Sequence, residues 1–235
     1  MTRAVKPEAL HVTGNPSHST LDAYERWAPT YPPVAHNPLM RAEERAMRRH
    51  WPDVAGRRAL DLACGTGRYS GLLVESQASH VVALDFSATM LSRVNTASRV
   101  RASMMQLPFA AGVFDAVVSG LALGHAPDIR QWMTEIARVL KSGGVLLYSD
   151  FHPDAARAGH SRKFKDESER VHAVPHHCYD VKVQTQTAAG AGLTIEAITE
   201  VRAGYELCEA FPKSEDFYRR WHGLPFVLIV RARKQ

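Results

Sequence analysis

DLACGTG, residues 61–67, is the stretch of this sequence that decides the fold. An apolar run ends inside it, glycines follow at Gly65 and Gly67, and a run compatible with a helix begins directly afterwards. Glycine lets the backbone turn sharply and pass close to a ligand, because it has no side chain and adopts left-handed conformations without strain. The stretch therefore predicts a strand, a tight turn and a helix, with a ligand close to the turn. Glycines alone are weak evidence for a particular ligand, so the neighbouring sequence must indicate which ligand binds at the turn.

A second feature lies at the end of the next apolar run. Asp85 closes HVVALDF, residues 80–86, about twenty residues beyond the glycine turn. A carboxylate at the end of the strand next to the turn can accept hydrogen bonds from both hydroxyls of an adenosine ribose. The two features together predict a site for a nucleoside-containing cofactor.

Two details favour S-adenosylmethionine (SAM) over a dinucleotide. Gly71 stands one position later than the third glycine of G-x-G-x-x-G, so the close helix packing of that fingerprint is not reproduced. Asp61 stands at the mouth of the turn, where its charge would repel a diphosphate but favour the ammonium and sulfonium of SAM. A nicotinamide-dependent oxidoreductase is therefore the disfavoured alternative.

From residue 58 onward, short apolar runs alternate with helical runs, which is the pattern of a mostly parallel sheet covered on both faces. We expect strands at 58–63, 80–85, 98–102, 114–119, 143–150, 193–201 and 224–233. The helices are expected at 67–75, 88–94, 129–140 and 180–190.

The sequence before this domain divides into two parts. Residues 1–17 show little periodicity and are predicted to form a flexible arm. Residues 18–52 are predicted to form a helical cap, with one helix that starts at Ser19 or Thr20 and a charged amphipathic helix at 39–50. Residues 53–235 would then form the α/β domain, including an insertion at 151–178.

Composition supports a single large core and excludes several function classes. The chain has 235 residues, of which 45% are hydrophobic, which suffices for one undivided α/β domain. The net charge of +5 comes from scattered lysines and arginines, so we expect no nucleic-acid partner. No apolar run is long enough to cross a membrane and no signal segment is recognisable, which predicts a cytoplasmic protein.

Cysteines and histidines do not predict a metal site. Cys64, Cys178 and Cys208 make an odd number with no paired spacing, so we expect reduced thiols rather than disulfides or structural zinc. His176 and His177 adjoin Cys178, but adjacent ligands without a second cluster seldom close a metal site. Entry of one of these histidines into a pocket is the preferred interpretation.

Four motifs in this order resemble the class I SAM-dependent methyltransferases, especially the group that contains ubiquinone/menaquinone C-methyltransferases and many small-molecule methyltransferases. They are LDLACGTG at 60–67, ALDFSATML at 83–91, LPF at 107–109 followed by FDAVVSGLALGH at 114–125, and ARVLKSGG at 137–144. The resemblance implies a Rossmann-like α/β fold, in which seven strands form a mostly parallel sheet with an antiparallel last strand. It also implies a ligand site across the carboxyl ends of the first strands.

The resemblance also implies roles for individual residues. Backbone at Ala63, Cys64 and Gly65 would contact the methionine part of the cofactor, and Asp85 and Phe86 the ribose and adenine. Relatives often carry an acidic residue four positions before LPF, where this chain has Ser103. The whole implied cofactor-binding set is Tyr24, Tyr31, Asp61, Ala63, Cys64, Gly65, Asp85, Phe86, Met90, Ser103, Met104, Met105 and Leu121. For Met104 and Met105 core packing is an equal alternative, as it is for Tyr24.

Methyl transfer from a sulfonium needs no protein nucleophile, since alignment and exclusion of water supply much of the rate. A base helps when the acceptor is a phenol, an alcohol or an activated carbon. His125 follows the fourth strand, and Asp150 and His152 follow the fifth, so these three are the candidate catalytic residues. The plainer interpretations are that Asp150 caps a turn and that His152 is a surface residue.

The insertion at 151–178 is interpreted as a lid over the acceptor site. Its charged stretch RKFKDESER, residues 162–170, is predicted to form the solvated face of a helix, and contact with an anionic acceptor or carrier is the alternative.

The predicted function is SAM-dependent methylation of a small molecule at oxygen, carbon or nitrogen, with S-adenosylhomocysteine as the second product. Two alternatives stay open: O-methylation of a malonyl group on an acyl-carrier protein, and a SAM-binding protein of this fold that transfers no methyl group. The acceptor, the use of a base and the choice between monomer and homodimer are not determined by the sequence.

Overall fold

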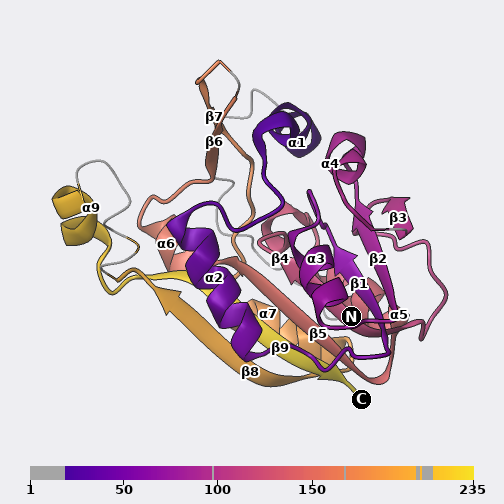
Figure 1. The fold of residues 1–235 in the computed structure, drawn as a ribbon. Coiled ribbons are helices and arrows are strands. Elements are labelled where there is room, and N and C mark those ends of the chain that lie inside the picture. Colours follow the sequence, from indigo (N-terminus) through magenta and orange to yellow (C-terminus); the bar gives the residue numbers. More distant parts are fainter. Residues whose placement is uncertain (1–18, 97, 167, 205–206, 208–213) are drawn as a thin grey trace, which may run out of the picture.

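The computed structural model describes residues 19–96, 98–166, 168–204, 207 and 214–235 (Figure 1). The predicted flexible arm at 1–17 and Cys208 lie outside this part of the chain.

A seven-stranded sheet in the order β3-β2-β1-β4-β5-β9-β8 forms the centre of the described structure. All pairs are parallel except those of β9, which runs antiparallel to both of its neighbours. The strands are β1 (Arg58–Leu62), β2 (His80–Asp85), β3 (Ser98–Arg101), β4 (Phe114–Gly120), β5 (Leu140–Phe151), β8 (Leu193–Arg202) and β9 (Pro225–Lys234). The predicted fold, with its antiparallel last strand, is confirmed.

Helices cover both faces of this sheet (Figure 1). The helices of the described structure are α1 (Thr20–Trp27), α2 (Pro38–Arg49), α3 (Arg68–Glu75), α4 (Ala88–Ser92), α5 (Ile129–Val139), α6 (Pro153–Arg157), α7 (Val181–Gly190) and α9 (Ser214–Trp221). Of these, α1 lies beyond the ends of the strands and α9 lies to one side of the sheet (Figure 1). Single 3-10 turns, η1 (Ala28–Thr30) and η2 (Leu123–His125), follow α1 and β4. The sequence predicted α1 to α5 and α7, but neither α6 nor α9. In the described residues, no helix has the length and apolar character that crossing a membrane requires.

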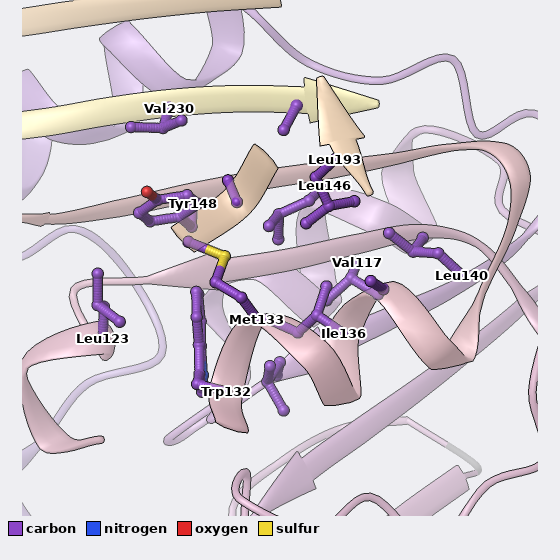
Figure 2. Packing of buried hydrophobic residues seen from close by; sticks show 14 of the residues in the cluster. Val117, Leu123, Trp132, Met133, Ile136, Leu140, Leu146, Tyr148, Leu193 and Val230 are labelled. Carbon is purple, nitrogen blue, oxygen red and sulfur yellow. The ribbon is translucent and has the colours of Figure 1, made fainter. Parts of the chain in front are cut away.

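Alternation along β5 sends neighbouring side chains to opposite layers of core. Leu146 and Tyr148 face the layer under α5 and α7, where Trp132 and Ile136 pack against them (Figure 2). Leu147 faces the other layer, which is closed by α2 and α3. Strands buried on both faces explain why the sequence shows continuous apolar runs rather than alternation.

The two cap helices begin where side chains can satisfy their first backbone amides. Ser19 and Asp22 form a capping box at the start of α1, and Asn37 accepts a hydrogen bond from the amide of Met40 at the start of α2. Pro38 follows Asn37 at the first helical position, where its missing N–H costs nothing. Both predicted cap helices are confirmed.

The prediction of a helix face at 162–170 is wrong. The described residues of this stretch belong to a two-stranded antiparallel hairpin, β6 (Lys163–Lys165) with β7 (Val171–Ala173). Asp166 Oδ1 accepts hydrogen bonds from the backbone amides of Ser168 at 2.8 Å and Arg170 at 3.1 Å. The backbone amide of Asp166 also donates to the carbonyl of Arg170 at 3.1 Å, so these hydrogen bonds close the turn between the two strands.

One buried carboxylate joins three elements of the fold. Glu43 on α2 has no exposed surface, and it accepts hydrogen bonds from Arg68 Nη1 at 2.6 Å and Tyr69 Oη at 2.6 Å, both on α3. Ser149 Oγ on β5 donates a third hydrogen bond at 2.5 Å. The cap helix α2 is thus held to the helix that follows the glycine turn and to a central strand.

We predict that Glu43→Gln lowers the free energy of unfolding by about 3–5 kcal/mol, because the buried guanidinium of Arg68 then loses its buried counter-charge and keeps only the more distant, partly exposed Glu44. Urea unfolding followed by circular dichroism measures this. Glu44→Gln is the matched control: Glu44 lies one position along α2, is 20% exposed and is 3.7 Å from Arg68, so its loss is expected to cost about 1 kcal/mol or less. Equal unfolding midpoints for the two variants would contradict the role of Glu43.

Candidate active site

A cavity of about 520 Å³ lies at the carboxyl ends of β1, β2 and β4, below α1. Its lining contains His125 and every residue of the set that the sequence analysis assigned to the cofactor. That set comprises Tyr24, Tyr31, Asp61, Ala63, Cys64, Gly65, Asp85, Phe86, Met90, Ser103, Met104, Met105 and Leu121. Residues more than a hundred positions apart in the sequence are therefore brought to one cavity.

The glycine turn has the backbone geometry that its sequence predicts. Gly65 and Gly67 have positive φ values of 55° and 92°, and Ala63 shares this region at 55°. A Cβ atom built on Gly65 would meet no atom within 4 Å, so the space beside the turn is open to a ligand. A Cβ on Gly71 would also meet nothing, so Gly71 does not provide the close helix packing of a dinucleotide fingerprint.

Asp85 fixes the turn to the end of β2. Its Oδ2 accepts a hydrogen bond from the amide of Gly65 and its Oδ1 from the amide of Ser87, both at 2.8 Å. Burial raises the pKa of Asp85, and these amides partly offset the rise because they favour the ionised form. Each carboxylate oxygen keeps a further lone pair for a ligand.

Asp61 is the second acidic residue of the cavity, and it is 1% exposed. Ser70 Oγ donates a hydrogen bond to its Oδ2 at 2.7 Å. Burial raises the pKa of Asp61 to about 7. A cationic ligand beside it would favour the ionised form.

His125 lies in η2 with its Nε2 atom 2.8 Å from Tyr24 Oη and 2.6 Å from Arg162 Nη1. A guanidinium can only donate hydrogen bonds, so Nε2 must accept, which places the imidazole proton on Nδ1. Burial and then the charge of Arg162 hold the pKa of His125 well below its usual range. The imidazole is neutral and a weak base in this arrangement.

The structure adds two arginines that the sequence analysis did not assign to the cavity, Arg68 and Arg162. Arg162 belongs to the stretch interpreted as a helix face. In the structure it immediately precedes β6, where Lys163 is exposed and Phe164 is buried. Period-two alternation places residues 162 and 164 on the same side of the chain, and that signal could have found Arg162.

Asp150 and His152 are not among the residues that line the cavity. Asp150 is 2% exposed, its Oδ1 lies 3.8 Å from His176 Nε2, and burial raises its pKa to about 7. His152 caps α6, because its Nδ1 accepts a hydrogen bond from the amide of Asp154 at 3.1 Å. His152 is 3% exposed, so the interpretation as a surface residue is also wrong.

The other histidines of the insertion also stay outside the cavity lining. His176 is buried against Gly124, where a Cβ atom would lie 1.8 Å from the imidazole, and His177 donates its backbone amide to the carbonyl of Gly124. Within the described ranges, no three His, Cys, Asp or Glu residues are grouped as metal ligands would be.

Comparison with known proteins identifies the family. The family model described as "Methyltransferase domain" matches residues 60–148, which contain the glycine turn and Asp85. A malonyl-[acyl-carrier protein] O-methyltransferase from Dechloromonas aromatica (strain RCB) is 32% identical over 205 residues, which are 86% of this chain and 76% of that protein. The chain belongs to the class I SAM-dependent methyltransferases.

Other relatives of this methyltransferase agree with the assignment. A demethylmenaquinone methyltransferase from Oceanobacillus iheyensis is 39% identical over 104 residues, which are 40% of this chain and 44% of that protein, so the chain spans less than half of that relative. The crystal structure of a SAM-dependent methyltransferase from Mesorhizobium loti has a TM-score of 0.67 and 26% identity, over 82% of this chain and 98% of that one.

The cavity fits the family's cofactor. SAM is cationic at its sulfonium and its ammonium, and the lining supplies two carboxyl groups, Asp61 and Asp85. The open space beside Gly65 allows backbone contact with the ligand. The methyltransferase therefore uses SAM and releases S-adenosylhomocysteine.

The raised pKa of Asp150 predicts how stability depends on pH. Between about pH 4, where an unfolded Asp titrates, and about pH 7, the folded protein holds a proton that the unfolded chain has released. The free energy of unfolding therefore falls as the pH rises through this interval, and Asp61 acts in the same direction. Asp150→Asn removes the contribution of Asp150.

Between pH 5 and pH 8, we expect the free energy of unfolding of Asp150→Asn to rise by on the order of 1–3 kcal/mol relative to that of the wild type. Urea unfolding at a series of pH values measures the difference. Asp53→Asn, at a side chain that is 79% exposed, is the control and should leave the pH dependence unchanged. A D150N curve parallel to that of the wild type would contradict the burial effect.

Proposed function

We propose that this methyltransferase methylates a small molecule that binds in the same cavity as SAM, beside His125 and Arg162. One observation carries the proposal: a single cavity is lined both by the strand-end residues Asp61 and Asp85 and by the cap and insertion residues Tyr24 and Arg162. Its volume of about 520 Å³ lies within the usual range of small-molecule sites, roughly 300–1,000 Å³.

On the cofactor side, the proposal assigns the ribose hydroxyls to Asp85, the adenine to Phe86 and Met90, and the methionine part to the backbone of Ala63, Cys64 and Gly65. The carboxylate of Asp85 supports this role, because it accepts backbone hydrogen bonds from Gly65 and Ser87 and keeps further lone pairs for the ribose hydroxyls. Ser103 is proposed to bind the adenine. Its Oγ accepts from the amide of Met105 at 3.1 Å, and its hydroxyl proton and a lone pair remain.

The proposed cap comprises residues 18–52 and the proposed lid residues 151–178. Their mutual packing supports the proposal that they act together: Phe164 of β6 stacks on Trp27 of α1, with ring centroids 4.9 Å apart. Ala23, Phe164 and Val174 form a small buried cluster between the two segments. A cover of this kind would exclude water from the transfer step.

The chemistry proposed for this chain is alignment rather than proton abstraction. The donor sulfonium supplies the methyl group, and displacement in line needs an acceptor atom held in position. His125 is proposed as a positioning residue, because its Nε2 already accepts from Arg162 and its pKa is low. Asp150 and His152 are not retained as catalytic residues in the proposal, since neither lines the cavity.

A second candidate for the methyl acceptor is a malonyl group on an acyl-carrier protein, which is the acceptor named for the Dechloromonas aromatica relative. The match over 86% of this chain supports it. Under this candidate the acyl-carrier protein would be a partner, and only the malonyl end would enter the cavity.

Incubation with methyl-labelled SAM tests the proposal. The acceptors are a pool of small acids, phenols and amines in one arm, and malonyl-loaded acyl-carrier protein in the other. Release of S-adenosylhomocysteine with a labelled small product supports the first candidate. Labelling of the carrier arm alone would contradict it and support the second.

For the ribose contact, we predict that Asp85→Ala weakens S-adenosylhomocysteine binding by roughly 1–3 kcal/mol, since two hydroxyls lose their acceptor. Isothermal titration calorimetry measures the affinity, and circular dichroism checks that the variant is folded. Asp115→Ala is the control, because Asp115 pairs with Lys141 and does not line the cavity. An unchanged affinity in folded D85A would refute the ribose contact.

For His125, we predict that His125→Ala lowers turnover about 10- to 100-fold through misplacement of Tyr24 and Arg162, while the affinity for S-adenosylhomocysteine stays within about two-fold. The pH profile separates positioning from base catalysis. Because the pKa of His125 lies well below its usual range, a base role would give wild-type turnover an acid limb at acidic pH, and we expect no such limb that disappears in the variant. Such a limb would identify His125 as a general base and overturn the positioning role.

A further inference from the structure

Arg162 is a buried cation at the edge of the cavity. Its residue is 8% exposed, and its Nη1 donates to the carbonyl of Leu121 at 2.8 Å and to His125 Nε2 at 2.6 Å. The guanidinium carbon lies 5.9 Å from the ring centroid of Tyr24 and 5.2 Å from that of Phe151. Both hydrogen-bond acceptors, the carbonyl of Leu121 and the imidazole of His125, are neutral, and the two aromatic rings attract the guanidinium only weakly.

No carboxylate oxygen of the described residues lies within 4.0 Å of this guanidinium. Asp150 is near enough for Arg162 to lower its pKa, but burial outweighs this and raises that pKa to about 7. The pair therefore forms no ion pair in the structure. At neutral pH, Asp150 is also only partly ionised.

Arg68 provides the comparison within the same cavity. It is 9% exposed, nearly as buried as Arg162, and its Nη1 lies 2.6 Å from Glu43 Oε2. Burial of a charge without a counter-ion costs several kcal/mol, and Arg68 avoids this cost through Glu43. Arg162 has no equivalent partner within the described chain, which points to a counter-ion supplied by a ligand.

The unused donors of Arg162 agree with this. Of the three guanidinium nitrogens, only Nη1 makes hydrogen bonds within the described residues. Nε and Nη2 are not fully buried atoms left without a partner, so they keep exposed surface. Since the side chain lines the cavity, these two nitrogens are available to a ligand there. Together Nε and Nη2 form the edge of a guanidinium that matches the two oxygens of a carboxylate.

We propose that Arg162 selects acceptors that carry a carboxylate, which it binds through Nε and Nη2. The proposal rests on the proposed function, because it places the acceptor in the cavity that also holds SAM. A carboxylate fits better than a phosphate. The only arginines in the described lining are Arg162 and the already paired Arg68, so one unpaired positive charge faces the ligand.

The arrangement around Arg162 serves this selection. Leu121 and His125 hold Nη1 of a side chain that lines the cavity, so the guanidinium is held in place before the acceptor arrives. Preorganisation of this kind reduces the entropy lost on binding. His125 thereby acts as a positioning residue for the acceptor's anionic group.

Binding of matched acid and amide probes tests the proposal on the wild-type protein saturated with S-adenosylhomocysteine. The probes are benzoate, 3-phenylpropionate and hexanoate, each paired with its primary amide, and ligand-observed NMR titration gives the dissociation constants. Each amide has nearly the shape of its acid but no charge. We expect at least one acid to bind about ten-fold or more tightly than its amide.

Variants assign the preference to one side chain. Arg162→Gln should bring the affinity for the acid down to that of its amide, and Arg162→Lys should keep a weaker preference for the acid, because it retains the charge but not the planar edge. Arg219→Gln, at a side chain on α9 that is 74% exposed, is the control and should keep the full preference. S-adenosylhomocysteine carries a carboxylate of its own, so its affinity is measured in all four proteins. We expect equal values, and a loss confined to the Arg162 variants would assign the guanidinium to the cofactor and overturn the proposal.

Equal binding of acids and amides by the wild type overturns the proposal, as does the failure of every acid to bind or a preference that survives in R162Q. These outcomes differ from a failure of the proposed function. Methylation of neutral small molecules only would leave the function standing and refute the role of Arg162. Labelling of the carrier arm alone would instead refute the small-molecule function.

Discussion

The buried carboxylate of Glu43 is the interaction on which the arrangement of the site depends. It receives hydrogen bonds from α3 and β5 while it belongs to α2, so the cap cannot shift without breaking a fully buried network. The network also neutralises Arg68 at the wall of the cavity. Without Glu43, Arg68 would keep only the more distant Glu44 as a counter-charge and would present a second, weakly compensated positive charge to a cofactor that is itself cationic.

With Arg68 neutralised, the remaining charges divide the cavity into two sides. Asp61 and Asp85 lie at the ends of the adjacent strands β1 and β2, where the glycine turn holds the space open. Arg162 lies beside Leu121, beyond the end of β4. An acidic side suits the cationic methyl donor, and a basic side suits an anionic acceptor. The two ligands would thus be attracted to different parts of one cavity and repelled from the wrong part.

His125 illustrates how the contacts of a side chain determine its chemical role. A histidine just beyond a strand end in a methyltransferase suggests a general base. Here Arg162 donates to Nε2, and burial keeps the imidazole neutral, so the same atom that could accept a proton is already occupied. Asp150 behaves similarly: its position near the end of β5 suggested the site, but its side chain is buried outside the cavity lining beside His176. Neighbours, rather than residue type, decide which titratable groups are available for chemistry.

The sequence by itself determined the sheet, its antiparallel last strand and the cofactor side of the cavity. These depend on local signals: apolar runs of strand length, glycines that need positive φ, and Asp85 at the end of a strand beside the turn. Only the tertiary structure brought Arg162 to the side of the cavity that is proposed for the acceptor. Arg162 reaches the cavity because the insertion forms a hairpin that packs on α1. The alternation at residues 162–164 could indicate a short strand, but not its packing on α1. The missing counter-ion of Arg162, the occupied Nε2 of His125 and the exclusion of His152 are relations between distant segments, which sequence spacing cannot specify.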